Sequence, residues 1–220
     1  MQPRSGKGAA ERSSKRSEHV PTTDDEIKEK YLERAIRELN QLAREVQECE
    51  HCPRGKLMPV LGSGHPLADI FMVKYAATNA EIEEGVAFYG RSGNALVKSF
   101  KRLGIDPLVV YGTLCAKCPT ADPELAADEC VRRLVEEMAI VQPRIVVVMG
   151  PRALATVNAL EVPLSRRIEE REGEIQAFTP TIDALYVPDI DSSLDEEGAK
   201  QRFWRAFRML GDWFDELPPY

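Results

Sequence analysis

The residues best suited to chemistry in this sequence are its five cysteines, most of which stand in closely spaced pairs. Cys49 and Cys52 are separated by two residues, as are Cys115 and Cys118, and Cys130 follows later. Two thiolates three residues apart can bind one ion from a tight turn, so the two pairs are typical of a four-cysteine zinc site. In a second set, Cys118 pairs with Cys130 and Cys115 is a small buried hydrophobe, a spacing that suits an iron–sulfur cluster. A third reading is that all five are buried apolar side chains. Spacing alone leaves these readings open.

The composition limits the classes of protein to which the chain can belong. Its 220 residues are 43% hydrophobic, and no apolar run approaches the roughly 20 residues of a membrane span. We therefore expect a disordered basic tail over residues 1–23 and one soluble domain over residues 24–220, with no membrane contact. The net charge of −7 argues against a strongly basic DNA-wrapping protein but allows a local basic face. Cysteines without an export signal predict a reducing compartment, with the cytoplasm as the default.

Apolar periodicity predicts alternating strands and helices. Helices are expected over residues 24–46, 92–103, 123–141, 153–160 and 196–217, and strands over residues 68–73, 108–114 and 143–150, with a further strand ending at residue 187. The segment with Glu81, Glu83 and Glu84 is expected to be a loop with solvated carboxylates. This alternation predicts an α/β fold, a three-layer α/β/α sandwich around a mainly parallel central sheet. Ligands bind such folds at the carboxyl ends of the strands.

A series of short motifs follows the same order as in one known family. The motifs are Cys49-x2-Cys52, Val60-Leu61-Gly62-Ser63-Gly64, the strand Ile70 to Val73, Phe88-Tyr89-Gly90-Arg91-Ser92-Gly93-Asn94-Ala95-Leu96, Lys117-Cys118-Pro119, Cys130, and Pro143 to Gly150. In their order over most of the chain, and in their spacing over its first half, they resemble the bacterial and archaeal iron–sulfur uracil-DNA glycosylases. The resemblance implies the fold of the uracil-DNA glycosylase superfamily and a DNA partner, single- or double-stranded, in base-excision repair.

The resemblance also implies a cofactor. In that family two cysteine pairs ligate a [4Fe-4S] cluster that is structural or orients DNA and does not take part in the reaction. The matching positions here are Cys49, Cys52, Cys118 and Cys130, and Cys115 lies outside the set. The resemblance therefore favours the iron–sulfur cluster over zinc.

The catalytic motifs of the family are degenerate in this chain. The acidic residue of the first motif, which activates water, is replaced by Tyr75, and the asparagine that reads uracil is replaced by Leu114. The aromatic residue that stacks on the flipped base is kept as Phe88. The segment that should carry a catalytic histidine has Asp189 and Asp191 instead, and these two carboxylates are weak candidates for catalysis. Three of the four expected functional positions are thus changed.

Three functional hypotheses follow from the sequence. The chain is a base-excision enzyme with altered chemistry, in which Asp189, Asp191 or the acids of residues 81–84 activate water. Alternatively it is a non-catalytic iron–sulfur module that binds DNA or a repair partner, or a redox or oxygen sensor unrelated to DNA. Basic side chains that could contact phosphates are Lys98, Lys101, Arg102, Arg132, Arg133, Arg166 and Arg167.

Overall fold

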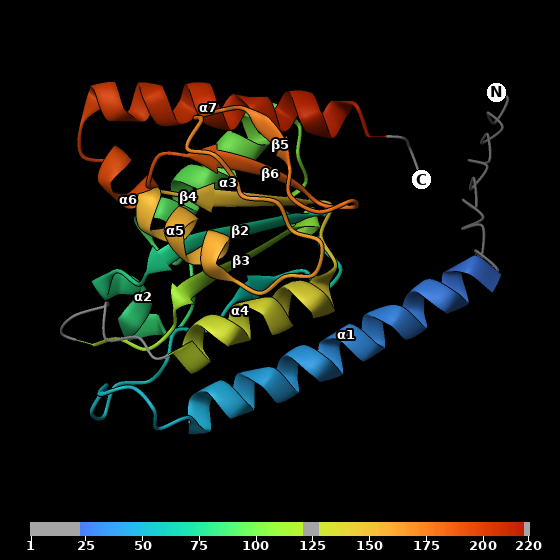
Figure 1. Ribbon diagram of the computed structural model, residues 1–220, viewed down its shortest axis with the longest axis vertical. Coiled ribbons are helices and arrows are strands. Elements are labelled where there is room, and N and C mark those ends of the chain that lie inside the picture. Colours follow the sequence, from blue (N-terminus) through green and yellow to red (C-terminus); the bar gives the residue numbers. More distant parts are fainter. Residues whose placement is uncertain (1–22, 121–127, 218–220) are drawn as a thin grey trace, which may run out of the picture.

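The computed structural model describes residues 23–120 and 128–217 and has three layers, with one sheet between two sets of helices (Figure 1). The strands are β1 (Ser63–Gly64), β2 (Ile70–Ala76), β3 (Val110–Ala116), β4 (Ile145–Met149), β5 (Ile175–Ala177) and β6 (Asp183–Val187). The α-helices are α1 (Thr23–Glu48), α2 (Asn79–Glu84), α3 (Arg91–Leu103), α4 (Asp128–Val141), α5 (Pro151–Ala159), α6 (Ile190–Ser193) and α7 (Glu197–Asp215), and a 3-10 helix covers Pro107–Val109. The predicted α/β sandwich is confirmed.

The sheet has the strand order β1-β3-β2-β4-β6-β5. The four inner strands are parallel, and the short edge strands β1 and β5 are antiparallel to their neighbours. From β2 the chain moves outward to β3 and then returns to β4 on the other side of β2. Because the winding reverses between β2 and β4, the connections after these two strands diverge. In α/β sheets ligands bind at the carboxyl ends of the strands beside such a reversal, and we call this expected site the crevice.

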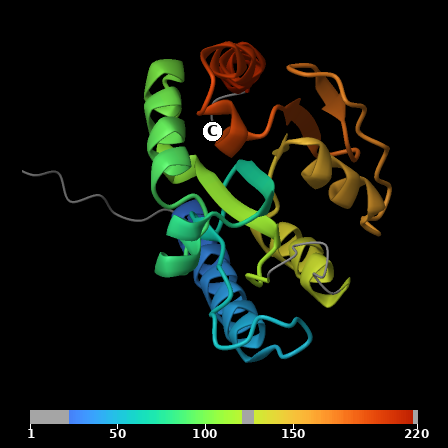
Figure 2. The same cartoon turned by 90° about the vertical axis from the view of Figure 1, so that its left-hand side faces the viewer.

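Alternate side chains of the inner strands build a separate core on each face of the sheet. Phe71 and Val146 are among the residues packed against α4 and α5. Met72 and Val147, one position further along, pack on the opposite face against α3 and α7. Figure 2 shows these two helical layers on either side of the strands. Burial on both faces explains the nearly continuous apolar sequence of β4.

Helix α1 lies outside α4 and extends beyond it along the edge of the molecule (Figure 1). Its buried residues are Ala35 in the middle of the helix and Leu42 and Val46 near its C-terminal end. The helix therefore brings its C-terminal end, and the cysteine turn that follows, close to α4.

Most predicted elements are present with shifted bounds. The strand expected over 68–73 is β2, which begins at Ile70 and runs on to Ala76, where it still pairs with Ala116 of β3. The short strands β1 and β5 and the helices α2 and α6 were not predicted, since two to six residues carry too little periodicity. The predicted tail lies, except for residue 23, outside the described residues, as do the first five residues of the helix expected over 123–141. Within the described ranges, none of the helices combines the length and the apolar character that crossing a bilayer requires.

Candidate functional site at the carboxyl ends of the strands

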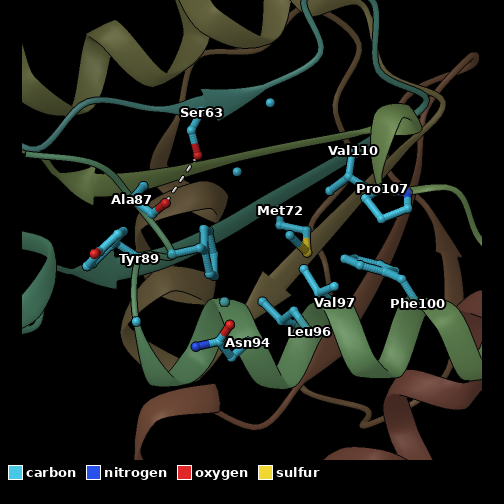
Figure 3. A pocket seen from close by; sticks show the side chains of 15 residues that line it. Ser63, Met72, Ala87, Tyr89, Asn94, Leu96, Val97, Phe100, Pro107 and Val110 are labelled. Atoms are coloured by element: carbon cyan, nitrogen blue, oxygen red, sulfur yellow. Dashed lines mark hydrogen bonds between the residues drawn. The ribbon is translucent and has the colours of Figure 1, made fainter. Parts of the chain in front are cut away.

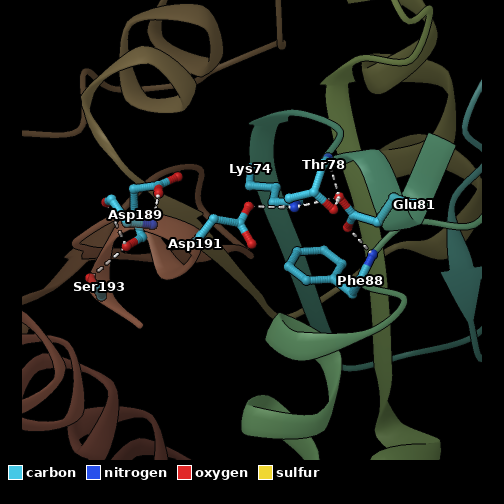
Figure 4. Close-up of polar contacts among 8 residues, drawn as sticks. Lys74, Thr78, Glu81, Phe88, Asp189, Asp191 and Ser193 are labelled. Atoms are coloured by element: carbon cyan, nitrogen blue, oxygen red, sulfur yellow. Dashed lines mark hydrogen bonds and ion pairs between the residues drawn. The ribbon is translucent and has the colours of Figure 1, made fainter. Parts of the chain in front are cut away.

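Lys74 lies near the end of β2, where the crevice opens, and its side chain is 1% exposed. Its ammonium group is 2.7 Å from Glu81 Oε2 and 2.6 Å from Asp191 Oδ2 (Figure 4). Burying a charge is costly unless it is paired and hydrogen-bonded, and the buried ammonium of Lys74 has two carboxylate partners. The pairs join β2 to the helix that follows it and to α6, which follows β6.

Glu81 is fully buried, which corrects the expectation of a solvated loop carboxylate. Thr78 caps α2, and its N–H and hydroxyl donate to Glu81 Oε2 over 2.7 and 2.9 Å. The backbone N–H of Phe88 donates to Glu81 Oε1 over 2.5 Å. Both oxygens of Glu81 are thus engaged, and the residue links the turn after β2, the ammonium of Lys74 and the backbone of Phe88.

Phe88 is half-buried and stands beside this network. Its φ of 59° lies in the left-handed region, which a bulky residue adopts only under strong local constraint. The bond from its N–H to Glu81 supplies one constraint. Another is Gly112 of β3, where a Cβ atom would lie 2.6 Å from the Phe88 ring. Lys74 Nζ is 5.5 Å from the ring centroid, a cation–π distance.

The two candidate catalytic carboxylates occupy different positions. Asp189 is the N-cap of α6, and its Oδ1 accepts from the N–H of Ser192 over 2.8 Å. Asp191 uses Oδ2 for Lys74, and its side chain is 29% exposed. Burial raises the pKa of Asp191 above its usual value, against the lowering effect of Lys74. Only Asp191 joins the buried network.

The two replaced motif positions have structural roles. Leu114 is fully buried beneath the site and packs with Val60 and Ala87. Tyr75 is half-buried, and the guanidinium carbon of Arg152, in the first turn of α5, lies 4.0 Å from its ring centroid. A leucine at position 114 offers no hydrogen bond to a base, and Tyr75 provides no carboxylate for activating water.

A groove of about 510 Å³ opens beside Phe88 along α3 (Figure 3). Its walls are mainly apolar and include Met72, Val97 and Phe100, and Ser63 donates a hydrogen bond to the carbonyl of Ala87 at its rim. The groove runs along α3 toward the start of β3, away from the carboxyl ends of the strands.

Four of the five cysteines lie in one region, where α1, β3 and α4 meet. Cys52, Cys118 and Cys130 form one buried cluster, and Cys49 lines a cavity of about 10 Å³ with Cys118 and Cys130. Cys115 lies apart in the main core, and burial raises its pKa to about 12. These positions group the four cysteines of the second set.

The thiols of this group contact one another directly. A hydrogen bond from the Cys118 thiol lowers the pKa of Cys130 to about 6 and raises the pKa of Cys118. The backbone N–H of Lys117 also donates to Cys130 Sγ over 3.1 Å. Among the residues that the structure describes, no group of three or more His, Cys, Asp or Glu side chains is arranged to hold a metal ion. The ligand set therefore remains a prediction, and cysteine thiolates are the usual donors to zinc and to iron–sulfur clusters.

A second buried ion pair lies next to the cysteines. Lys117 Nζ is 2.7 Å from Glu137 Oε2, and Thr113 donates to the same oxygen over 2.8 Å. The hydroxyl of Tyr111 lies 3.2 Å from Glu137 Oε1. Since Lys117 follows β3 and Glu137 belongs to α4, this pair holds together the two segments that carry Cys118 and Cys130.

The basic side chains suggested for phosphate contacts do not form one group. Lys98, Lys101 and Arg102 are exposed on α3, and Arg102 stacks on Trp204 of α7. Arg133 of α4 is paired with Glu45 and Glu136. Arg132 is exposed on the same helix, and Arg166 and Arg167 are exposed in the segment after α5.

The sequence reasoning missed Lys74 and the roles of its partners. Two signals were present. A lysine directly after the apolar run Ile70–Val73 is unusual within a buried strand, and Thr78 followed three residues later by Glu81 is a capping-box pattern that predicts a helix start. Neither signal connects Lys74 with Asp191, which is 117 residues further along the chain.

The comparisons with known proteins agree with this fold. No curated protein matches the chain. The family model of the Uracil DNA glycosylase superfamily matches residues 61–208, which include the six strands and every residue of the Lys74 network but neither Cys49 nor Cys52. The match covers more than half of the chain, so this protein belongs to the uracil DNA glycosylase superfamily.

Proposed function

We propose that this protein is a DNA-associated iron–sulfur module that recognises bases in DNA and does not excise uracil efficiently. The observation that carries the proposal is the Lys74–Glu81–Asp191 network in the crevice. It occupies the place where a glycosylase of this superfamily needs a free acid, a free donor and room for a base.

Excision requires groups that the crevice does not offer. Of the two carboxylates that could activate water, Asp189 caps α6, and Asp191 has one oxygen, Oδ2, paired with Lys74. The departing base carries negative charge, which needs a hydrogen-bond donor or a positive charge. The cation of this network, Lys74, is already paired with two carboxylates. Asp191 would moreover repel an anionic base.

Binding requires less, and the necessary parts are present. The superfamily acts on DNA bases, and Phe88 is half-buried at the crevice with its backbone fixed by Glu81. Stacking on an aromatic ring is worth roughly 1–3 kcal/mol per base and needs no catalytic group. DNA association without turnover is therefore consistent with the residues that remain.

We further propose that Cys49, Cys52, Cys118 and Cys130 hold the [4Fe-4S] cluster. The buried cluster of Cys52, Cys118 and Cys130 supports this set, and so do the position of Cys49 beside Cys118 and Cys130 and the position of Cys115 in a different core. When bound, the cluster would tie the turn after α1 to the end of β3 and the start of α4. Its contribution would be structural, because it lies apart from the crevice.

The test begins with anaerobic purification and metal analysis, for which we expect about four irons per chain and little zinc. The protein is then incubated with single- and double-stranded oligonucleotides that contain uracil, and abasic sites are scored after alkali. We expect DNA binding that weakens with salt and no cleavage above that of a cluster-intact Phe88→Ala variant. Cleavage above this control would contradict the proposal and make Asp191 the first residue to mutate. Zinc in place of iron would refute the cluster assignment.

A further inference from the structure

We propose that Asp191 reads the bound base and selects one that carries an exocyclic amino group, such as cytosine, over uracil. This inference rests on the proposed function, because it assumes that the crevice receives a base. It assigns to Asp191 a role in specificity that needs no catalytic step.

Asp191 is fixed on one side and accessible on the other. Lys74 holds Oδ2 at 2.6 Å, while Oδ1 has no hydrogen-bond partner among the described residues. The side chain is 29% exposed, and in Figure 4 its carboxylate extends from α6 toward Lys74, with the ring of Phe88 near the same ammonium. A base that contacts Phe88 would therefore meet a carboxylate oxygen that is held in place and still able to accept a hydrogen bond.

The surroundings fix the position of the Asp191 carboxylate. Both oxygens of Glu81 are engaged, so Lys74 is held firmly and cannot turn away to serve a ligand. One ammonium faces two carboxylates, and the excess negative charge at the crevice favours a ligand that brings hydrogen-bond donors.

An ionised carboxylate can only accept hydrogen bonds, and this property distinguishes cytosine from uracil. The two bases have nearly the same shape, but cytosine presents an amino group where uracil presents a carbonyl oxygen. Asp and Glu accept hydrogen bonds from the amino group of cytosine. A carbonyl oxygen placed against the same carboxylate is repelled and leaves both acceptors unsatisfied.

The experiment compares the binding of single-stranded oligonucleotides that differ only in one central base, cytosine or uracil, within an otherwise abasic context. A hydrogen bond to a charged group is worth about 1.5–3 kcal/mol, so we expect the cytosine oligonucleotide to bind about 10-fold tighter or more. Asp191→Asn can donate as well as accept and should lose most of this preference. The matched control is Asp195→Asn, which changes an exposed acid of the neighbouring loop and should keep it. Thermal melting of each variant verifies that it is folded.

The outcomes separate this inference from the proposed function. Equal binding of cytosine and uracil, or a preference for uracil, would overturn the role of Asp191 while leaving DNA binding intact. A cytosine preference that survives Asp191→Asn would also overturn it, because another group would then read the base. If the wild-type protein does not bind DNA at all, the proposed function is refuted, and this inference with it.

Discussion

Replacing Lys74 by Met measures how strongly the buried network depends on its only ammonium. The variant keeps a long unbranched side chain but leaves Glu81, whose side chain is 0% exposed, without a cation. Removing one partner of a buried ion pair costs about 3–5 kcal/mol. Glu81 would keep its three hydrogen bonds from Thr78 and Phe88, and Asp191 can turn toward solvent. We therefore expect a loss of about 3 kcal/mol, at the lower end of that range.

Urea denaturation is the assay, with the midpoint and its slope followed for wild type and variant. The loss comes from leaving the buried Glu81 carboxylate without its cation, so Lys74→Met combined with Glu81→Gln, which removes both charges, should lose less stability than Lys74→Met alone. Arg34→Met is the control, because its ion pair with Glu38 is exposed and should not measurably affect the midpoint. A Lys74→Met protein as stable as wild type would refute the burial of the pair. An equal or greater loss in the double variant would mean that packing, not the unpaired charge, is responsible.

Three further predictions concern Asp191, the cysteines and Phe88. Burial raises the pKa of Asp191, whose charged neighbours are Lys74, Glu81 and Asp189. The stability that its protonated carboxyl contributes is therefore present in acid and decreases as the pH rises above the ordinary value of 3.8. In urea denaturation across this range, Asp191→Asn should remove that decrease. Iron analysis after anaerobic purification should find the cluster in Cys115→Ala and not in single serine variants of Cys49, Cys52, Cys118 or Cys130. Gly112→Ala places a Cβ atom 2.6 Å from the Phe88 ring and should weaken binding of single-stranded DNA as Phe88→Ala does, with unchanged iron content.

Much of the fold could be predicted because apolar periodicity and turn-forming residues such as Gly and Pro are local features of the sequence. The apolar run of β4 and the 3.6-residue pattern of α7 each reflect burial along one element, so each pattern can be recognised within the segment that forms the element. The order of strands in the sheet, the two-residue β1 and the four-residue α6 leave no such pattern. Those elements form because neighbouring strands and loops hold them in place.

The candidate site was predictable only in part, for the same physical reason. Asp191 and Phe88 could be singled out from motif positions, but the solvated role expected of Glu81 was wrong. A carboxylate on a short polar segment is usually exposed, and only the parallel arrangement of β2 and β6 brings Lys74 into reach of both acids. Pairing over 117 residues is a property of the sheet and not of any local pattern.

Under the proposed function, the buried network also explains how a protein with a glycosylase fold can bind a base without cleaving it from its sugar. Catalysis requires stronger contacts in the transition state than in the ground state, when the base becomes an anion. Asp191 would do the reverse, since its carboxylate accepts from an amino group of the intact base and repels the anion that cleavage would form. Lys74 cannot compensate, because Glu81 and Asp191 share its charge. The same residues that would favour an amino-bearing base in the crevice would therefore raise the barrier to its excision.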